Sequence, residues 1–484
     1  MKRRQFVTTA ASAAVLGAVP ATAAAQPRFI PRRPRIFTRM EITAFSADPA
    51  LVQALRNGIQ AMKNVTNAQD NRSFAYWHNS HWMASGSPPP AMASVWNQCK
   101  HGVPYFYAWH RGYVYYFERM LRTMAATAGP VPANFALPYW DYYKHPSIPA
   151  IYASPTYDGG KTNPLYDATR TGTTMSGLDY SPYASTVVNF PTGTANDYED
   201  LVEDNPHGWV HGLIGGDMGN VPTAGYDPIF YLHHCNIDRL WAAWVKADGS
   251  RAMPAASDPW WNQSWSYDTA GTWNVSVKTM ANTLNLAYTY SDLTLPAKFR
   301  IIILRPILIQ LLEEATPRSG AIAHGGGVAL GMRSVSVALP VATEQRTRLH
   351  ALARTPNPPP AEGASLVLDG VRLTASGRRG GYAYGVYLNL PATGGNNAAD
   401  PRQYYVGSVN SFAISTQEMM HGANGVTLVF PLSAALAAQE RAGLLKDDTH
   451  MTVSFVRTGV PRGASADTQF VTVGSISIVA GAPR

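Results

Sequence analysis

Histidine spacing gives this sequence its clearest chemical pattern. His207 and His211 are four residues apart, which places two imidazoles on one face of a helix, one turn apart. The pair His233-His234 follows in an apolar run. A histidine pair at helical spacing with a third histidine nearby is typical of metal sites, because imidazole binds zinc, copper, iron and nickel. The alternative is a set of ordinary surface or core histidines.

A second group of histidines lies earlier in the chain. It consists of His78, His81, His101 and His110. Two groups that each offer three imidazoles predict two metal ions. No acidic ligand cluster and no Cys-x-x-Cys accompanies them, which argues against calcium, iron–sulfur and structural zinc sites. Imidazole ligands in a neutral, aromatic surrounding favour copper.

The segments that must position these histidines have helical patterns. Apolar residues recur at helical spacing over residues 49–65, and again from Trp109 to Met124, where Gly129-Pro130 ends the second helix. Glu118 lies two turns after His110 and faces the same side. Loops rich in Gly, Pro, Ser and Thr follow. The first part of the chain is therefore predicted to be a helix bundle with long loops.

The sequence changes character after about residue 290. From about residue 334, short runs alternate apolar and polar residues and are separated by Gly, Pro, Asn and Asp, which predicts an antiparallel β-sandwich. The apolar run 301–315 is interrupted by Arg305-Pro306 and is therefore not expected to be a transmembrane helix. We expect three parts: a mainly α domain at residues 26–300, a linker at residues 301–333 and an all-β sandwich at residues 334–484.

The amino-terminus has the features of an export signal. Residues 1–25 combine a basic start, a short apolar region and small residues before a cleavage site, and Arg3-Arg4-x-Phe6 matches the twin-arginine signature. We therefore expect export by the twin-arginine route, to the periplasm or out of the cell. The chain has two cysteines, so no disulfide framework is expected. A formal net charge of +8 over 484 residues predicts no nucleic-acid partner.

Two longer motifs carry a family resemblance. Residues 101–118 read HGVPYFYAWHRGYVYYFE, and residues 227–238 read DPIFYLHHCNID. They resemble the first and second copper signatures of the type 3 copper family, which comprises tyrosinases, catechol oxidases and hemocyanins. The resemblance covers roughly residues 40–290, and both motifs are long and stand in the family's order. More weakly, the strand-rich end resembles the sandwich domain that follows the catalytic domain in plant-type polyphenol oxidases.

The resemblance implies a pair of copper ions and a set of six ligands. The second signature has its ligand at the second member of the histidine pair, hence at His234 rather than His233. For the first ligand, His78 is the alternative to His81. The implied ligands are His81, His101 and His110 for one copper, and His207, His211 and His234 for the other.

Neighbouring residues acquire roles from the same resemblance. Glu203 matches the glutamate that holds an active-site water in plant-type relatives. Gly208 stands where several tyrosinases have an asparagine that helps to deprotonate phenols, which argues against efficient monophenol hydroxylation. Cys99-x-His101 matches the spacing at which some members form a cysteine–histidine thioether, and the alternative is a buried free thiol.

The second signature also contains supporting residues. Asp238, one turn after His234, is expected to orient a ligand or to pair with Arg111 or Arg239. Phe230, one turn before His234, is expected to pack on its ring. Both residues would act on the metal through the ligands that they hold.

The implied activity is copper-dependent oxidation of phenols by dioxygen: o-hydroxylation of monophenols and oxidation of o-diphenols to o-quinones. Alternatives are a catechol oxidase without monophenolase activity, an o-aminophenol oxidase and a dioxygen carrier. The implied partners are a phenolic substrate and dioxygen, and the sequence gives no indication of the oligomeric state. The sandwich is expected to shield the copper entrance through a bulky residue between Tyr404 and Met420, with a stabilising or oligomerising module as the alternative.

Overall fold

A computed structural model describes most of the chain. The described residues are 35–190, 197–297, 320–355, 362–391, 403–422, 424–445 and 449–481, with the backbone of 308–311. The export signal expected at residues 1–25 lies outside them. Residues 36–484 form one compact unit. None of the described helices is both long and apolar enough to cross a membrane.

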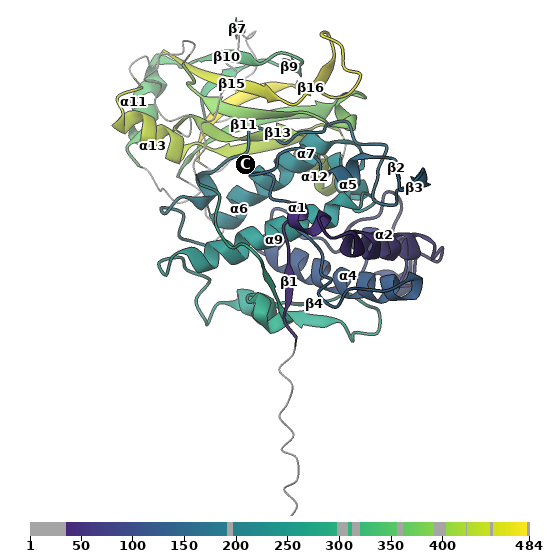
Figure 1. Cartoon of the computed structure of the whole chain (residues 1–484). Helices are drawn as coiled ribbons and strands as arrows, with labels where there is room; N and C mark the ends of the chain where they lie inside the picture. The colour runs from purple at the N-terminus through teal and green to yellow at the C-terminus, as the bar shows by residue number, and fades with distance from the viewer. Residues whose placement is uncertain are drawn as a thin grey trace, which may run out of the picture. The chain divides into compact units, whose positions relative to one another are not determined.

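Three long helices form the centre of the helical part (Figure 1). They are α2 (Pro49–Lys63), α4 (Phe106–Ala128) and α9 (Ile229–Ala247), with α4 packed against both of the others. The Asp48 side chain caps α2 by accepting hydrogen bonds from the first free backbone N–H groups of the helix. A Cβ atom at Gly58 would lie 2.9 Å from the Leu121 carbonyl oxygen, so the glycine allows α2 and α4 to approach closely.

Shorter helices carry His81, His207 and His211. They are α3 (Phe74–His81), η3 (Glu203–Gly208) and α7 (Trp209–Ile214), and α6 (Tyr198–Val202) leads into η3. The helical path is broken at Asn205, whose backbone has φ −145° and ψ 112°. It resumes before α7, with Gly208 at φ −61° and ψ −32°. His207 and His211 therefore share a helical segment that starts only after this break.

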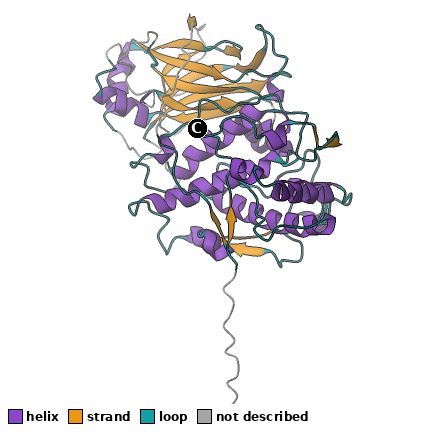
Figure 2. Cartoon of the chain, viewed as in Figure 1, coloured by secondary structure: helices purple, strands orange, loops and turns teal. Residues whose placement is uncertain are grey.

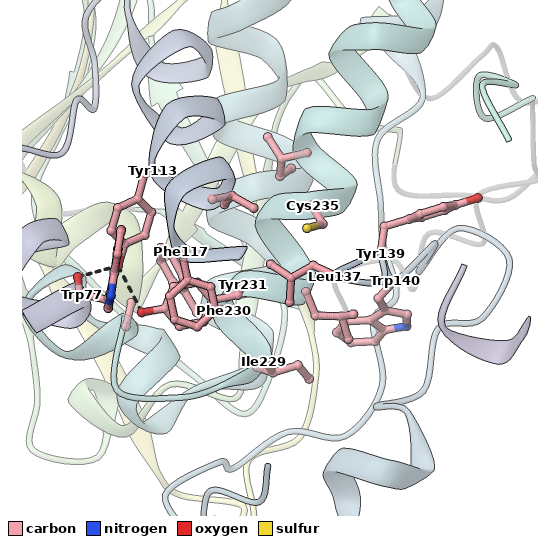
Figure 3. Close-up of a cluster of buried hydrophobic side chains, with 14 of the residues drawn as sticks. Trp77, Tyr113, Phe117, Leu137, Tyr139, Trp140, Ile229, Phe230, Tyr231 and Cys235 are labelled. Atoms are coloured by element: carbon pink, nitrogen blue, oxygen red, sulfur yellow. Dashed lines mark hydrogen bonds between the residues drawn. The ribbon is translucent and has the colours of Figure 1, made fainter. Parts of the chain in front are cut away.

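An aromatic cluster joins α3, α4 and α9 (Figure 3). The rings of Phe117 and Tyr231 stack with centroids 3.5 Å apart. The Tyr113 hydroxyl donates to the Trp77 carbonyl oxygen at 2.5 Å and lies 3.1 Å from the Tyr231 hydroxyl oxygen. Buried aromatic pairs of this kind stabilise packing beyond the area that they bury. These aromatic contacts thus hold α3, α4 and α9, which carry histidines, in fixed positions relative to one another.

The carboxy-terminal part is a sandwich of two sheets (Figure 2). One sheet has the strand order β13-β12-β15-β10-β7, and the other β8-β17-β11-β16-β9 with β14 also paired to β11. The strand pairs of both sheets are antiparallel except β7 with β10, so the predicted antiparallel sandwich is confirmed. The strands are β7 (Leu308–Leu311), β8 (Ala321–Gly325), β9 (Val328–Gly331), β10 (Val335–Pro340), β11 (Ala364–Leu373), β12 (Ala383–Leu388), β13 (Tyr405–Asn410), β14 (Val426–Pro431), β15 (His450–Thr458), β16 (Gln469–Val473) and β17 (Ser475–Ala480).

The sandwich differs from its prediction in two ways. Strands β7, β8 and β9 lie inside the stretch 301–333 that was expected to be a linker. These short segments become strands because β10, β17 and β16 supply their hydrogen-bond partners. In addition, the sandwich contains three helices that alternation did not predict: α11 (Thr343–Ala353), α12 (Ser411–His421) and α13 (Ser433–Arg441).

The two parts have separate hydrophobic cores. One core is built from helical-part residues between Ile42 and Tyr290, and the other from sandwich residues between Ile322 and Ile478. Two sandwich residues are exceptions, because Ala383 and Phe412, the latter at the start of α12, pack into the core of the helical part. The aromatic side chain of Phe412 thus extends from the sandwich toward the histidines.

Candidate metal centre

The first histidine group meets at the end of α3 and on α4. His81 is the last residue of α3, His101 lies in the loop before α4, and His110 lies in the second turn of α4. Their ring nitrogens come within 4.8 Å of one another, and all three side chains are buried. The alternative, His78, is not in this group, because its ring lies against Tyr226 with centroids 3.5 Å apart.

The second group contains four imidazoles rather than three. His207, His211, His233 and His234 have ring nitrogens within 4.8 Å of one another and are fully buried. The Nε2 atoms of His211 and His234 lie 3.4 Å apart. The His234 ring also stacks on His110 at 4.5 Å, so this residue faces the first group.

The hydrogen bonds of the histidines fit a metal centre. The Nδ1 atoms of His110, His207 and His211 lie 2.8, 3.2 and 2.8 Å from the carbonyl oxygens of Phe106, Glu203 and Met218. An Nδ1–H that donates to a carbonyl leaves the Nε2 lone pair free for a metal. The Nε2 atoms of His81, His101, His110 and His207 are buried without a hydrogen-bond partner. Buried nitrogens of this kind are costly unless a ligand occupies them.

Burial also sets the charge of these rings. It lowers the pKa of His101 to about 3, and it lowers the pKa of His110, His207, His211 and His234 well below the usual value, with neighbouring imidazoles adding to the effect. Neutral imidazole is the form that binds metal. The protein therefore holds the rings ready for metal at neutral pH.

The acidic residues of the two signatures hold the helices together. Asp238 accepts hydrogen bonds from Arg111 and from the Tyr288 hydroxyl, the latter at 2.5 Å. Arg39 joins Asp238 to Glu118, at 3.3 and 2.8 Å. Of the two arginines expected for Asp238, the structure pairs it with Arg111. The carboxylates thus lock α4 and α9 in the arrangement that brings the histidines together.

Two predicted neighbours lie where the resemblance suggested. The Phe230 ring is 4.2 Å from the His234 ring, centroid to centroid. The Cys99 sulfur lies 3.4 Å from Nδ1 of His101, and burial raises the pKa of this thiol. The thioether between them stays a prediction. Cys235 is a buried free cysteine of the helix core.

Glu203 lies at the edge of the histidine groups. Its carboxylate accepts a hydrogen bond from the Gly102 N–H at 2.8 Å, and its backbone carbonyl accepts from His207. Burial raises the pKa of Glu203 to about 8. A carboxyl group beside both histidine groups is suited to hold a water molecule or a proton.

Phe412 of the sandwich covers the histidines. Its ring stacks on His211 with centroids 4.0 Å apart, and meets His207 edge-on at 5.3 Å and His101 at 5.7 Å. It is 3% exposed, so it is enclosed between the two parts of the protein. It lies inside the stretch Tyr404 to Met420, in which the sequence alone did not single it out.

A hydrogen-bond network holds the segment that carries Phe412. The Asp204 carboxylate accepts from the Tyr405 hydroxyl at 2.9 Å and from the Ser408 hydroxyl at 2.6 Å. The Asn410 side chain donates to Ser408 at 3.2 Å and caps α12 by accepting from the Ala413 N–H at 2.9 Å. Asp204 precedes His207 by three residues, so the network links the histidine segment directly to the base of Phe412.

Sequence reasoning missed Asp204 as a contact residue. The sequence indicates this role only weakly, because an aspartate next to Glu203 is typical of an acidic turn. Its partners Tyr405 and Ser408 are about 200 residues away, on β13.

Comparison with known proteins identifies the helical part. Residues 68–183 and 165–247 match the family described as "Common central domain of tyrosinase", and residues 320–481 match a domain of unknown function, DUF7868. The chain is 31% identical over 255 residues to tyrosinase HcTyr1 of Hahella sp. (strain CCB-MM4), and this alignment covers 45% of this chain and 53% of that protein. The chain is 30% identical over 236 residues to the chloroplastic polyphenol oxidase of Malus domestica, and this alignment covers 40% of this chain and 38% of that protein.

The chain thus spans about half, or less, of the length of these curated relatives. Among solved structures, latent apple tyrosinase aligns with 92% of this chain and 97% of its own, at a TM-score of 0.54 and 21% identity, which shows a common fold. The clustered histidines all lie within the matched central domain. Residues 68–247, which contain the clustered histidines, are therefore similar to the common central domain of tyrosinase.

Proposed function

We propose that the protein oxidises phenols with dioxygen at a pair of copper ions, as a tyrosinase. It would hydroxylate monophenols at the ortho position and oxidise o-diphenols to o-quinones. The observation that carries this proposal is the meeting of two buried imidazole groups, with Nε2 atoms of His211 and His234 3.4 Å apart and further Nε2 atoms free of partners. Copper bound there supplies the binding and reduction of dioxygen.

We assign the ligands as two sets of three. His81, His101 and His110 would hold one copper, and His207, His211 and His234 the other. His234 is preferred to His233 because its ring stacks on His110 of the first group. His233, next to Tyr142, would fill the space behind the site.

Glu203 would act on the proton of the phenol. A monophenol has an unperturbed pKa of about 10 and must lose its proton before its ring reacts. A water held by the Glu203 carboxyl group would receive that proton. Cations bound at the histidines would lower the pKa of Glu203 and favour its charged form.

A catechol oxidase without monophenolase activity is the second candidate, and Gly208 favours it. A Cβ atom at this position would lie 3.3 Å from the Glu203 carbonyl oxygen and 3.8 Å from the Phe412 ring. The chain therefore has no side chain at the place from which a second polar group would reach the water on Glu203. Proton removal would depend on Glu203 alone.

The sandwich would shield the site through Phe412. Its ring occupies the side of His207 and His211 that a phenol ring would approach. Substrate turnover would require this ring to move, whether by rotation of the side chain or by displacement of the sandwich. The 3% exposure of Phe412 supports a closed resting state.

Oxygen uptake by copper-loaded protein tests the activity. L-tyrosine and L-DOPA are supplied separately, with His211→Ala as the inactive control. Uptake with both substrates is expected of a tyrosinase, and uptake with L-DOPA alone of a catechol oxidase. No uptake with either substrate, even from the Phe412→Ala variant, would reject both.

We also propose that the protein is exported. The leader at residues 1–25 would direct export by the twin-arginine route, because Arg3-Arg4-x-Phe6 has the required pattern. Replacing both arginines by lysine should leave the protein inside the cell. Continued export of that variant would reject this route.

A further inference from the structure

A cavity opens between the helical part and the sandwich. Its volume is about 990 Å³, within the size range of small-molecule sites. His207, Gly208 and Phe412 line its inner end. The Nε2 atom of His207 is buried there without a partner. The cavity thus ends beside the proposed copper site, where Phe412 closes it while the sandwich is in place.

One wall of the cavity is acidic. Asp200, Glu203 and Asp204 follow one another at helical spacing along α6 and η3, and all three line the cavity. Among the described lining residues the acids are Asp179, Asp200, Glu203 and Asp204, and Arg441 is the only arginine or lysine. Glu203, with its pKa raised to about 8, is mostly neutral at pH 7, so the other acids supply the negative charge that favours a positively charged ligand.

Asp200 is the acid best placed to meet a ligand. Glu203 accepts from Gly102, Asp204 from Tyr405 and Ser408, and Asp179 from Ser181. The Asp200 side chain is exposed to the cavity. Partial desolvation by the cavity walls, and then the charge of Asp197, raises its pKa to about 6.

Another part of the lining is apolar and comes from the sandwich. It includes Val406, Met420, Val429 and Phe430, and Met420 and Val429 are 45% and 44% exposed. A cavity that offers both apolar side chains and carboxylates fits a ligand with an aromatic ring and a positively charged end. Neither a plain hydrocarbon nor an anionic phenol matches both kinds of lining.

We propose that this cavity selects phenols that carry a protonated amine, with Asp200 as the residue that recognises the amine. The inference rests on the proposed oxidase function and names its substrate class. The ring lies against the apolar part of the lining next to Phe412, with its hydroxyl toward His207. The sandwich thereby determines specificity as well as covering the site.

Equilibrium binding to the full chain tests the preference without turnover. Tyramine, p-cresol and 3-(4-hydroxyphenyl)propionate share a phenol ring and differ in charge, and their Kd values are measured by calorimetry on copper-free protein. We expect tyramine to bind roughly tenfold more tightly than the anion, as for an ion pair in a partly enclosed site. Added salt should reduce the difference. Equal Kd values, or preference for the anion, would overturn the proposal.

Variants of Asp200 test whether this residue causes the preference for a protonated amine. Asp200→Asn should weaken tyramine binding about three- to tenfold and leave p-cresol unchanged, because it removes only the charge. Asp200→Lys should reverse the order of the charged ligands. Asp248→Asn removes the same charge from an exposed site after α9 and should change nothing. Tyramine binding that is unaffected by Asp200→Asn would overturn the role of this residue.

Kinetics separates this inference from the activity on which it rests. In the copper-loaded Phe412→Ala protein, the KM for oxygen uptake should rise from dopamine through 4-methylcatechol to 3,4-dihydroxyphenylpropionate. Uptake with equal KM values would overturn the inference and keep the oxidase function. If no catechol supports uptake while tyramine still binds selectively, the oxidase function fails and the cation preference stands as a binding property.

Discussion

The ring of Phe412 stacks on the imidazole of His211, with centroids 4.0 Å and planes 20° apart. The two residues are 201 positions apart and come from different parts of the protein, yet Phe412 packs into the hydrophobic core of the helical part, which surrounds the histidines. A residue of the sandwich thus lies where a phenol ring must stack to reach the proposed copper site. Access and specificity therefore depend on the sandwich.

Replacing Phe412 by alanine should activate the intact chain. Ring stacking stabilises by about 0.5–1.5 kcal/mol, and the substrate no longer has to displace the ring, so kcat/KM for L-DOPA should rise about tenfold or more. Loss of a buried phenyl ring should also lower the free energy of unfolding by roughly 3 kcal/mol. Oxygen uptake and urea unfolding measure the two effects.

The matched control is Val460→Ala, which shortens an exposed side chain of the sandwich outside the cavity lining. It should leave kcat/KM within a factor of about two, because it creates no opening at the histidines. If Phe412→Ala and Val460→Ala have the same kcat/KM as the parent protein, Phe412 is not a shield.

Replacing Asp204 by asparagine should loosen the segment that holds Phe412. Asparagine keeps the shape but exchanges one charged acceptor oxygen for an amide, so the hydrogen bonds from Tyr405 and Ser408 are weakened or lost. The expected loss of stability is about 1–3 kcal/mol. The intact chain should gain activity toward L-DOPA in the same step.

Two variants on the sandwich side refine this test. Tyr405→Phe removes one donor and Ser408→Ala another, so each should have a smaller effect in the same direction. A double variant of Asp204→Asn with Phe412→Ala should be no more active than Phe412→Ala alone. Additive gains in the double variant would mean that Asp204 acts by a route other than Phe412.

Introducing asparagine at Gly208 should raise hydroxylation of monophenols. The variant is made in the Phe412→Ala background, because a Cβ atom at position 208 would already lie 3.8 Å from the Phe412 ring. An amide next to the water on Glu203 should increase the ratio of L-tyrosine to L-DOPA turnover by roughly tenfold, through easier proton removal. Gly208→Ala should leave the ratio unchanged, and an unchanged ratio in Gly208→Asn would mean that Glu203 alone controls deprotonation.

Local patterns in the sequence predicted much of this fold. The helix expected at residues 49–65 is α2 at Pro49–Lys63, and the aromatic helix expected from Trp109 is α4, which starts at Phe106. Their apolar periodicity is strong because both are buried on one face. The alternation of apolar and polar residues in the sandwich is equally clear. The stretch that contains β8 and β9 is instead predicted to be a linker, because its glycine and alanine residues do not alternate between apolar and polar.

The contact between the two parts could not be predicted from local patterns. Phe412 lies in α12, a segment without strong helical periodicity, and its partner His211 lies about 200 residues earlier. Likewise, no local pattern indicates that Asp204 accepts hydrogen bonds from Tyr405 and Ser408. Such pairings depend on the packing of one domain on another, which single-residue spacing does not encode.

His233 should make the metal-free protein less stable at acid pH. Burial lowers its pKa to about 3 in the folded state, against 6.5 when exposed. Between these values the unfolded chain binds a proton that the folded chain does not, so the contribution of neutral His233 is present above pH 6.5 and declines as the pH falls. Replacing it by leucine removes this dependence.

The expected result is a pH-dependent difference between His233→Leu and the parent protein. From pH 6.5 to pH 5 the parent should lose about 2 kcal/mol relative to the variant, which is the linkage value for one group over that interval. Urea unfolding of both proteins at the two pH values, without copper, measures it. The comparison cancels the opposite contribution of Glu203, whose raised pKa favours the folded state at low pH in both proteins. A constant difference across this range would mean that His233 is protonated in the folded protein.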